Sequence, residues 1–201
     1  MASPTWARNL ARQFLQDSLP RRWAHTQGVA AAAAGLSSIL GADAGLIEAA
    51  AWLHDVGYSP ALAATGFHPL DGARYLRDVH HADGLLCRLV AHHSGALGEA
   101  AERGLAEELA GEFPFPPGDL YDALSYSDFT TGPDGERMTV EQRIAEITAR
   151  YGPDDLVTRI VTRAAPEMKA TVSRVAARLA EGSALKIPVL SLSGIRTLRA
   201  A

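Results

Sequence analysis

The 201-residue chain contains a single cysteine, Cys87. One cysteine can form neither an intramolecular disulfide nor a thiolate metal cluster, so both are excluded. The chain also has no uninterrupted apolar run of the ~18 residues that a membrane span needs. Its first residues lack a charged segment followed by an apolar one. We therefore expect a cytoplasmic protein that does not contact a membrane.

An excess of basic residues is likewise missing. Lysine and arginine number 19 against 23 aspartate and glutamate residues, which gives a formal net charge of -4. Surfaces that bind nucleic acid are usually basic, so we expect no nucleic-acid polymer as a partner. A small phosphorylated substrate remains compatible with this charge, because a bound metal ion can hold phosphate locally.

Strand-like alternation of β-branched and aromatic residues is scarce, whereas apolar residues recur at helical spacing throughout. This pattern predicts an all-α fold, and a chain of this length fits one domain. Three prolines in residues 113–118 mark the clearest break between helices. Glycine, proline and capping residues place the expected helices at about residues 6–19, 21–40, 43–53, 69–79, 83–93, 95–111, 119–129 and 139–151, with two more that begin near 153 and 166 and reach 181.

His54 and Asp55 stand at the end of the apolar segment 46–53. A buried aspartate is costly unless it is paired or bound to a cation, and the negative end of a helix dipole disfavours it further. Imidazole and carboxylate together suit Fe, Mn, Zn or Co. His25 and Asp128 are further candidate ligands. Taken alone, His25 also fits a core histidine bonded to a backbone carbonyl, and Asp128 also fits a surface residue at a helix end.

His25, His54-Asp55 and Asp128, in that order, resemble the H…HD…D signature of the HD-domain superfamily. The resemblance extends from about Arg21 to Ile147. It implies an all-α HD-domain helical bundle and a metal-dependent phosphohydrolase that acts on phosphomonoesters or phosphodiesters, often of nucleotides. We expect residues 1–181 to form this domain and residues 182–201 to be a C-terminal tail that is flexible or loosely docked.

Further histidines resemble the HD proteins that bind two metals. His68 begins a segment similar to their "HP..GA..L" motif, and His92-His93 matches a second extra-histidine position, with His93 favoured because Ser94 follows it. HD-GYP phosphodiesterases and diadenosine tetraphosphate hydrolases belong to this group. The chain differs from them in having no Gly-Tyr-Pro motif after His93, and in having Tyr58 where many hydrolases carry lysine.

The resemblance implies two divalent ions, of Fe, Mn, Co, Mg or Zn, and a metal-activated water that attacks a small, nucleotide-like phosphorylated substrate. Asp55 would bridge the ions and act in catalysis together with His54. The implied ligands are His25, His54 and Asp128 on one ion, and His68 with His93 or His92 on the other. Arg74, Arg137 and Arg143 are candidate phosphate-binding residues, although each also suits a solvated surface.

Two other functions are compatible with the same residues. Mixed-valent diiron oxygenases that resemble myo-inositol oxygenase use the same histidine and aspartate ligand set. A non-catalytic HD protein that binds a nucleotide or a protein partner could keep the metal for a structural role. Iron content with oxygen uptake would indicate the oxygenase, whereas phosphate release would indicate the hydrolase.

Overall fold

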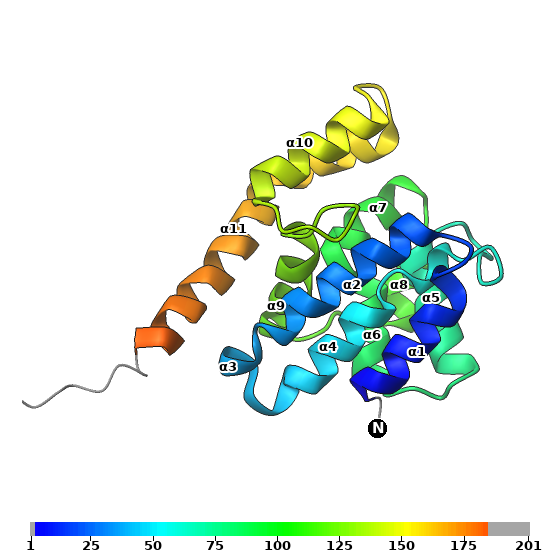
Figure 1. Ribbon diagram of the computed structural model, residues 1–201. Helices are drawn as coiled ribbons and strands as arrows, with labels where there is room; N and C mark the ends of the chain where they lie inside the picture. Colours follow the sequence, from blue (N-terminus) through cyan, green and yellow to red (C-terminus); the bar gives the residue numbers. More distant parts are fainter. Residues whose placement is uncertain (1–2, 185–201) are drawn as a thin grey trace, which may run out of the picture.

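The computed structural model describes residues 3–184 (Figure 1). These residues form helices and connecting loops without a β-strand, so the predicted all-α fold is confirmed. The helices are α1 (Pro4–Leu15), α2 (Pro20–Ala34), α3 (Ser37–Leu40), η1 (Gly41–Asp43), α4 (Ala44–Leu53), η2 (Val56–Tyr58), α5 (His68–Asp78), α6 (Gly84–His92), η3 (His93–Gly95), α7 (Ala96–Glu102), α8 (Ala106–Glu112), α9 (Gly118–Phe129), α10 (Val140–Tyr151) and α11 (Leu156–Ala184).

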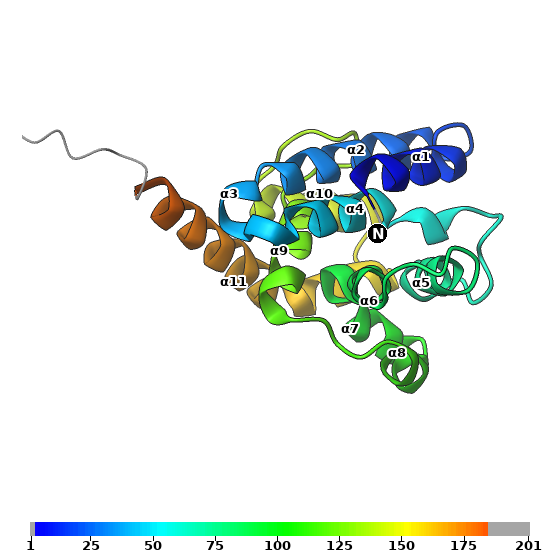
Figure 2. The ribbon, with the colours of Figure 1, turned by 90° about the horizontal axis from the view of Figure 1, so that it is seen from below.

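Helix α4 lies at the centre of the bundle. It packs against α1 and α2 on one side and against α6 and α9 on the other (Figure 2). Three of its consecutive residues, 49–51, are buried alanines, and Ile47 and Leu53 are also fully buried. Small side chains let neighbouring helices approach α4 closely. The end of α4 is therefore held inside the molecule, where a polar group needs a partner.

Helices α10 and α11 form a hairpin that extends to one side of the remaining helices (Figure 1). Helix α11 also packs along α9. A small second cluster of buried apolar side chains, Phe129, Val140 and Met168, joins this hairpin to α9. The hairpin is thereby attached next to the end of α9, where Asp128 lies.

Three predicted helix boundaries were wrong. The helix expected at 21–40 is divided into α2 and α3, with a tight turn in which the N–H of Leu36 bonds to the carbonyl of Ala33. The helix expected at 95–111 is divided into α7 and α8, because Gly104 adopts a positive φ of 73° that ends α7. The third difference concerns the C-terminal helix.

The two helices expected from about residues 153 and 166 are one helix, α11, which contains Pro166. Proline inside a helix costs about 3 kcal/mol, since it removes a hydrogen bond and clashes with the preceding turn. Thr158 and Met168 are buried on the two sides of Pro166, so packing of the whole helix offsets that cost. The helix runs to Ala184, three residues past the predicted end of the domain at 181. The predicted tail falls almost entirely in residues 185–201, outside the described part of the chain.

Within residues 3–184, no single helix is long and apolar enough to cross a membrane. One pair, Pro20–Ala34 with Ser37–Tyr58, meets the length and composition criteria when taken together across a bend of 53°.

Candidate metal centre

The His54-Asp55 pair ends α4, and both side chains are buried. Immediately afterwards the chain turns through η2, which contains Gly57. A Cβ atom on Gly57 would lie 2.0 Å from the carbonyl oxygen of His68, so only glycine permits α5 to begin this close to the turn. Gly57 therefore allows His68, the first residue of α5, to reach Asp55.

The loop before His68 is held by a buried carboxylate. Asp71 accepts hydrogen bonds of 3.0–3.1 Å from the backbone N–H groups of Ala64, Thr65 and Gly66, and another from the Thr65 hydroxyl. These bonds fix the loop against the first turn of α5. They position His68 without Asp71 touching the candidate ligands.

His25 and Asp128 come together from α2 and α9, with 3.0 Å between His25 Nε2 and Asp128 Oδ1. The loop after α9 also reaches α2. A Cβ atom on Gly28 would lie 2.4 Å from the carbonyl oxygen of Gly135, so the helix and loop can touch only at glycine. This contact places the carbonyl of Gly132 2.9 Å from His25 Nδ1.

Replacing Gly28 by alanine is expected to lower the free energy of unfolding by about 1–2 kcal/mol, measured by denaturant unfolding. Steric overlap with Gly135 costs more than the roughly 1 kcal/mol that alanine gains over glycine inside a helix. Gly98→Ala is the matched control, because no atom lies within 4 Å of the added Cβ. That substitution should stabilise the protein by about 0.5–1 kcal/mol. Equal stabilisation by both alanines would contradict the proposed role of Gly28.

Three histidines have their orientation fixed in the same way. The Nδ1 atoms of His25, His54 and His93 lie 2.7–2.9 Å from backbone carbonyl oxygens, those of Gly132, Ala51 and Val90 respectively. Because a carbonyl only accepts, each Nδ1 carries a proton, so in the neutral form of each ring Nε2 offers a lone pair to the interior. His54 Nε2 is buried and has no hydrogen-bond partner among the described residues. Such a nitrogen fits a metal ion.

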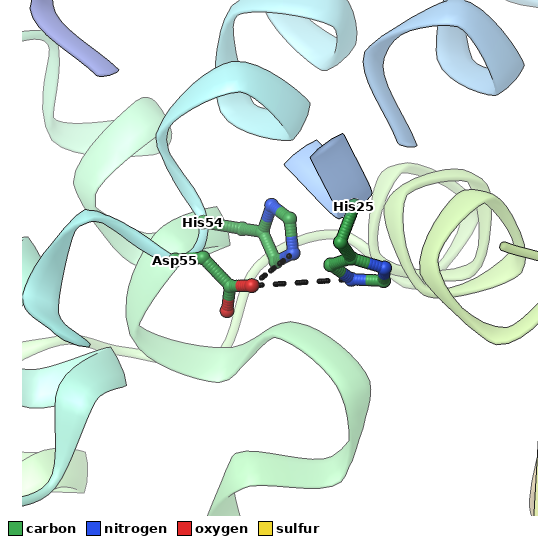
Figure 3. A group of neighbouring side chains, drawn as sticks. All are labelled: His25, His54 and Asp55. Carbon is green, nitrogen blue, oxygen red and sulfur yellow. Dashed lines mark ion pairs between the residues drawn. The ribbon is translucent and has the colours of Figure 1, made fainter. Parts of the chain in front are cut away.

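Asp55 lies between two pairs of histidines. Its Oδ2 atom is 3.3 Å from His54 Nε2 and 3.9 Å from His25 Nε2, contacts that Figure 3 draws. Its Oδ1 atom is 3.4 Å from His68 Nε2 and 4.0 Å from His93 Nε2. Each carboxylate oxygen therefore faces a different pair of ring nitrogens.

Six predicted ligands thus meet in one cluster. Their donor atoms form three overlapping groups in which all atoms lie within 4.8 Å of one another: His25, His54 and Asp55; His54, His93 and Asp128; and Asp55, His68 and His93. Four imidazoles and two carboxylates form a donor set that suits Fe, Mn, Co or Zn.

The two carboxylates of the cluster are ionised at neutral pH. Burial alone would raise the pKa of Asp55, but the Arg22 guanidinium at 2.9 Å and the neighbouring His54 hold this pKa well below its usual range. Burial opposes ionisation of Asp128 as well, and its hydrogen bond with His25 outweighs that effect and lowers the pKa of Asp128. Two negative charges are therefore available to a cation.

Two histidines of the cluster are neutral at the same pH. Burial lowers the pKa of His68 well below its ordinary value, and lowers that of His93 to about 4. Their Nε2 atoms are 3.2 Å apart. Burial would also lower the pKa of His54, but Asp55 beside it raises this pKa instead. His68 and His93 can therefore offer lone pairs without first losing a proton.

The sequence interpretation missed Arg22 and assigned no role to Tyr58. The Arg22 guanidinium donates to Asp55 Oδ2 and lies 4.1 Å above the centre of the Tyr58 ring. On its other side, the Tyr58 ring stacks on His68, with centroids 3.8 Å apart and planes 16° apart. Arg22 precedes His25 by three residues, a spacing that puts both on one face of a helix. That spacing could have identified Arg22.

Ser94 is a second residue that sequence reasoning left without a role. It adopts a positive φ of 52°, and its hydroxyl donates to Asp128 Oδ2. Its backbone N–H bonds to the Ser125 hydroxyl at 3.2 Å. Ser94 therefore orients Asp128 from the side opposite His25.

His92 lies outside the cluster, which corrects its inclusion among the predicted ligands. Its Nε2 atom bonds to the carbonyl of Phe113 at 2.6 Å, and its ring packs edge-on against Phe115. His92 ends α6, whereas His93 has a non-helical backbone and begins η3, so the two adjacent rings meet different neighbours. His93 is the one that faces the cluster.

Of the three predicted phosphate-binding arginines, only Arg143 lies near the cluster. One of its nitrogens is 4.0 Å from Asp128 Oδ1. Arg74 instead bonds to Glu108 and Glu112, and Arg137 lies over the Tyr126 ring. These two placements are corrections, since a carboxylate or an aromatic ring elsewhere holds each side chain.

A cavity of about 140 Å³ borders the cluster. Its polar side includes Asp55, His68, His93 and Asp128, together with three arginines, Arg22, Arg143 and Arg150. Fixed guanidinium groups beside a metal site are suited to holding an anion. The candidate ligands that line this cavity are therefore accessible to a small molecule.

Fold and cluster together define an all-α protein whose histidine and aspartate side chains could hold metal ions. The model of the HD domain family matches residues 22–154, more than half of the chain. The chain belongs to the HD domain family, whose typical members are metal-dependent hydrolases. The comparisons with curated proteins and with solved structures found no match.

Proposed function

We propose that the protein is a metal-dependent phosphohydrolase that cleaves a phosphomonoester or phosphodiester bond of a small substrate. The observation that carries the proposal is the position of Asp55, whose two oxygens face two different histidine pairs. This arrangement suits a carboxylate that bridges two divalent cations, of Fe, Mn, Co, Mg or Zn. When bound, such cations supply Lewis acidity that activates water and polarises phosphoryl oxygens.

The protein side chains have separate tasks in this proposal. His25, His54 and Asp128 would hold one ion, and His68 and His93 the other. Arg22 keeps Asp55 ionised and oriented. An arginine has five N–H donors, so Arg22 retains donors for a phosphate oxygen while it bonds to Asp55. Arg143 borders the same cavity next to Asp128 and would contact the phosphate from the other side.

The proposal is tested by elemental analysis of protein purified without added metal, followed by a screen of phosphomonoesters and phosphodiesters with the ion found. We expect about two metal ions per chain and release of phosphate or of an alcohol from at least one ester class. A ratio near one would remove His68 and His93 from the ligand set. Full metal content without any hydrolysis would overturn the proposed activity.

A diiron oxygenase is the second candidate function. Four imidazole and two carboxylate donors lie around one centre, a set that also suits iron. This candidate requires tightly held iron and oxygen consumption in the presence of substrate. Oxygen-electrode measurements on protein with its iron retained separate it from the hydrolase, which releases phosphate without oxygen.

Replacing Arg22 by lysine is expected to lower kcat/KM for hydrolysis roughly 10- to 100-fold, because a charged hydrogen bond contributes ~1.5–3 kcal/mol. Lysine keeps the positive charge but loses the planar group that both donates to Asp55 and stacks on Tyr58. Arg74→Lys is the matched control, since Arg74 pairs with Glu108 and Glu112 away from the cavity. In steady-state kinetics, the kcat/KM of Arg74→Lys should equal that of the parent protein. Equal losses in the two variants would count against the role of Arg22.

A further inference from the structure

The cavity beside the cluster has apolar as well as polar lining. Beside the ligands and arginines it has an apolar wall from the α10–α11 hairpin, formed by Ile147, Val157, Ile160, Val161, Ala164 and Met168. The five residues on α11 follow the spacing i, i+3, i+4, i+7 and i+11, which puts them on one face of the helix. A phosphate group alone would not contact such a wall favourably.

Part of this wall is not explained by packing within the protein. Val161, Ala164 and Met168 pack in the second apolar cluster, with Phe129. Ile147, which is 8% exposed, lines the cavity together with Val157 and Ile160, and the latter two belong to neither cluster of buried apolar side chains in the described chain. Val157 and Ile160 are only partly buried. Their apolar surface faces the cavity in place of the core.

Most of the wall lies outside the segment that matches the family. The match to the HD domain family ends at residue 154, and α11 begins at Leu156. The ligand cluster therefore lies in the family segment, whereas most of the apolar wall comes from the helix that follows it. The type of reaction and the choice of substrate can thus depend on different segments of the chain.

We propose that Ile147, Val157 and Ile160 form a binding site for an apolar group attached directly to the phosphate of the substrate. This inference rests on the proposed phosphohydrolase function and narrows its substrate class to esters of compact aliphatic or aromatic alcohols. The cavity volume of about 140 Å³ supports a compact group, because typical sites for drug-sized ligands are ~300–1,000 Å³. A dinucleotide exceeds this space.

The test measures binding of non-hydrolysable phosphonates to the full-length, metal-loaded protein by calorimetry. Methyl-, propyl- and butylphosphonate extend the apolar group stepwise, and cyclohexyl- and phenylphosphonate separate an aliphatic ring from a planar one. We expect affinity to rise roughly fourfold for each buried methylene group. Equal affinities across the series would overturn the inference while leaving the proposed function intact. Absence of binding by every phosphonate would overturn both.

Variants locate the effect at the wall. Ile160→Asn is expected to remove most of the gain in affinity from methyl- to butylphosphonate, because a polar side chain would replace part of the apolar wall. Leu97→Asn is the matched control, because Leu97 is 42% exposed on α7 and does not line the cavity. An unchanged chain-length dependence in Ile160→Asn would contradict the assignment. If Ile160→Asn does not fold, the phosphonate binding series on the protein without substitutions still tests the inference.

Discussion

Replacing Asp55 by asparagine is expected to reduce the metal content from about two ions per chain to less than one and to lower the rate of hydrolysis roughly a thousandfold. Both histidine pairs meet at this carboxylate, so a single substitution affects both proposed ion sites. Stabilisation of transition-state charge by bound cations contributes several kcal/mol, and each 1.36 kcal/mol corresponds to a factor of ten in rate. Elemental analysis and steady-state kinetics measure the two effects.

The same substitution should also change stability in a defined direction. Arg22 would lose its anionic partner while most of its side chain stays buried, because only 22% of that side chain is exposed. Breaking a buried ion pair from one side costs about 3–5 kcal/mol, and the remaining exposure of Arg22 reduces this cost. Metal-free Asp55→Asn protein should therefore unfold at a lower denaturant concentration than the metal-free parent.

Asp122→Asn is the matched control for Asp55→Asn. Asp122 lies on α9, the helix of Asp128, and also bonds to an arginine, Arg174, but that pair is outside the cluster. We expect unchanged metal content and activity, with a stability change below about 1 kcal/mol, because the pair is near the surface. Retention of two ions by Asp55→Asn would contradict the proposal that Asp55 helps to hold both ions.

The residues that the sequence predicted best are those whose position is determined by local chain geometry. His54 and Asp55 end an apolar helix just before a glycine, and His68 directly precedes a proline that opens the next helix. Polar residues at the ends of otherwise apolar helices can be recognised in the sequence as candidate ligands, without any knowledge of how the helices pack. The all-α fold was predictable for a similar reason, since helical periodicity is a local property.

The residues that the sequence predicted poorly depend on tertiary placement. The choice between His92 and His93 is decided by the rotation of α6 against its neighbours, and one sequence carries no information on that rotation. The guanidinium of Arg74 is chemically suited to phosphate, yet it is bonded to Glu112, which lies on another helix almost 40 residues further along the chain. The Arg22–Tyr58–His68 stack likewise joins three separate segments. Pro166 inside α11 shows packing overriding a local helix-breaking preference.

Removing the metal by chelation is expected to lower the midpoint of thermal unfolding by roughly 8–16 °C. A ligand present at a thousand times its dissociation constant stabilises the folded state by ~4 kcal/mol. For a protein of this size, 1 kcal/mol corresponds to roughly 2–4 °C. Thermal scans with and without chelator measure the shift, and re-addition of the ion should restore the midpoint. An unchanged midpoint would mean that the cluster holds no ion in the purified protein.

The pH dependence of the chelated protein provides a second readout of the same cluster. Burial lowers the pKa of folded His68 and His93, the latter to about 4, whereas an unfolded histidine titrates near ~6.5. Their contribution to stability is therefore complete above pH ~6.5 and decreases as the pH falls below that value. His54, whose folded pKa is raised, contributes stability that is complete below pH ~6.5 and is lost as the pH rises above that value. Because this contribution stays constant between pH 6.5 and 4, the thermal-unfolding midpoint of the metal-free protein should decrease across that interval. His93→Gln should reduce this fall, and His81→Asn, at an exposed histidine outside the cluster, should not.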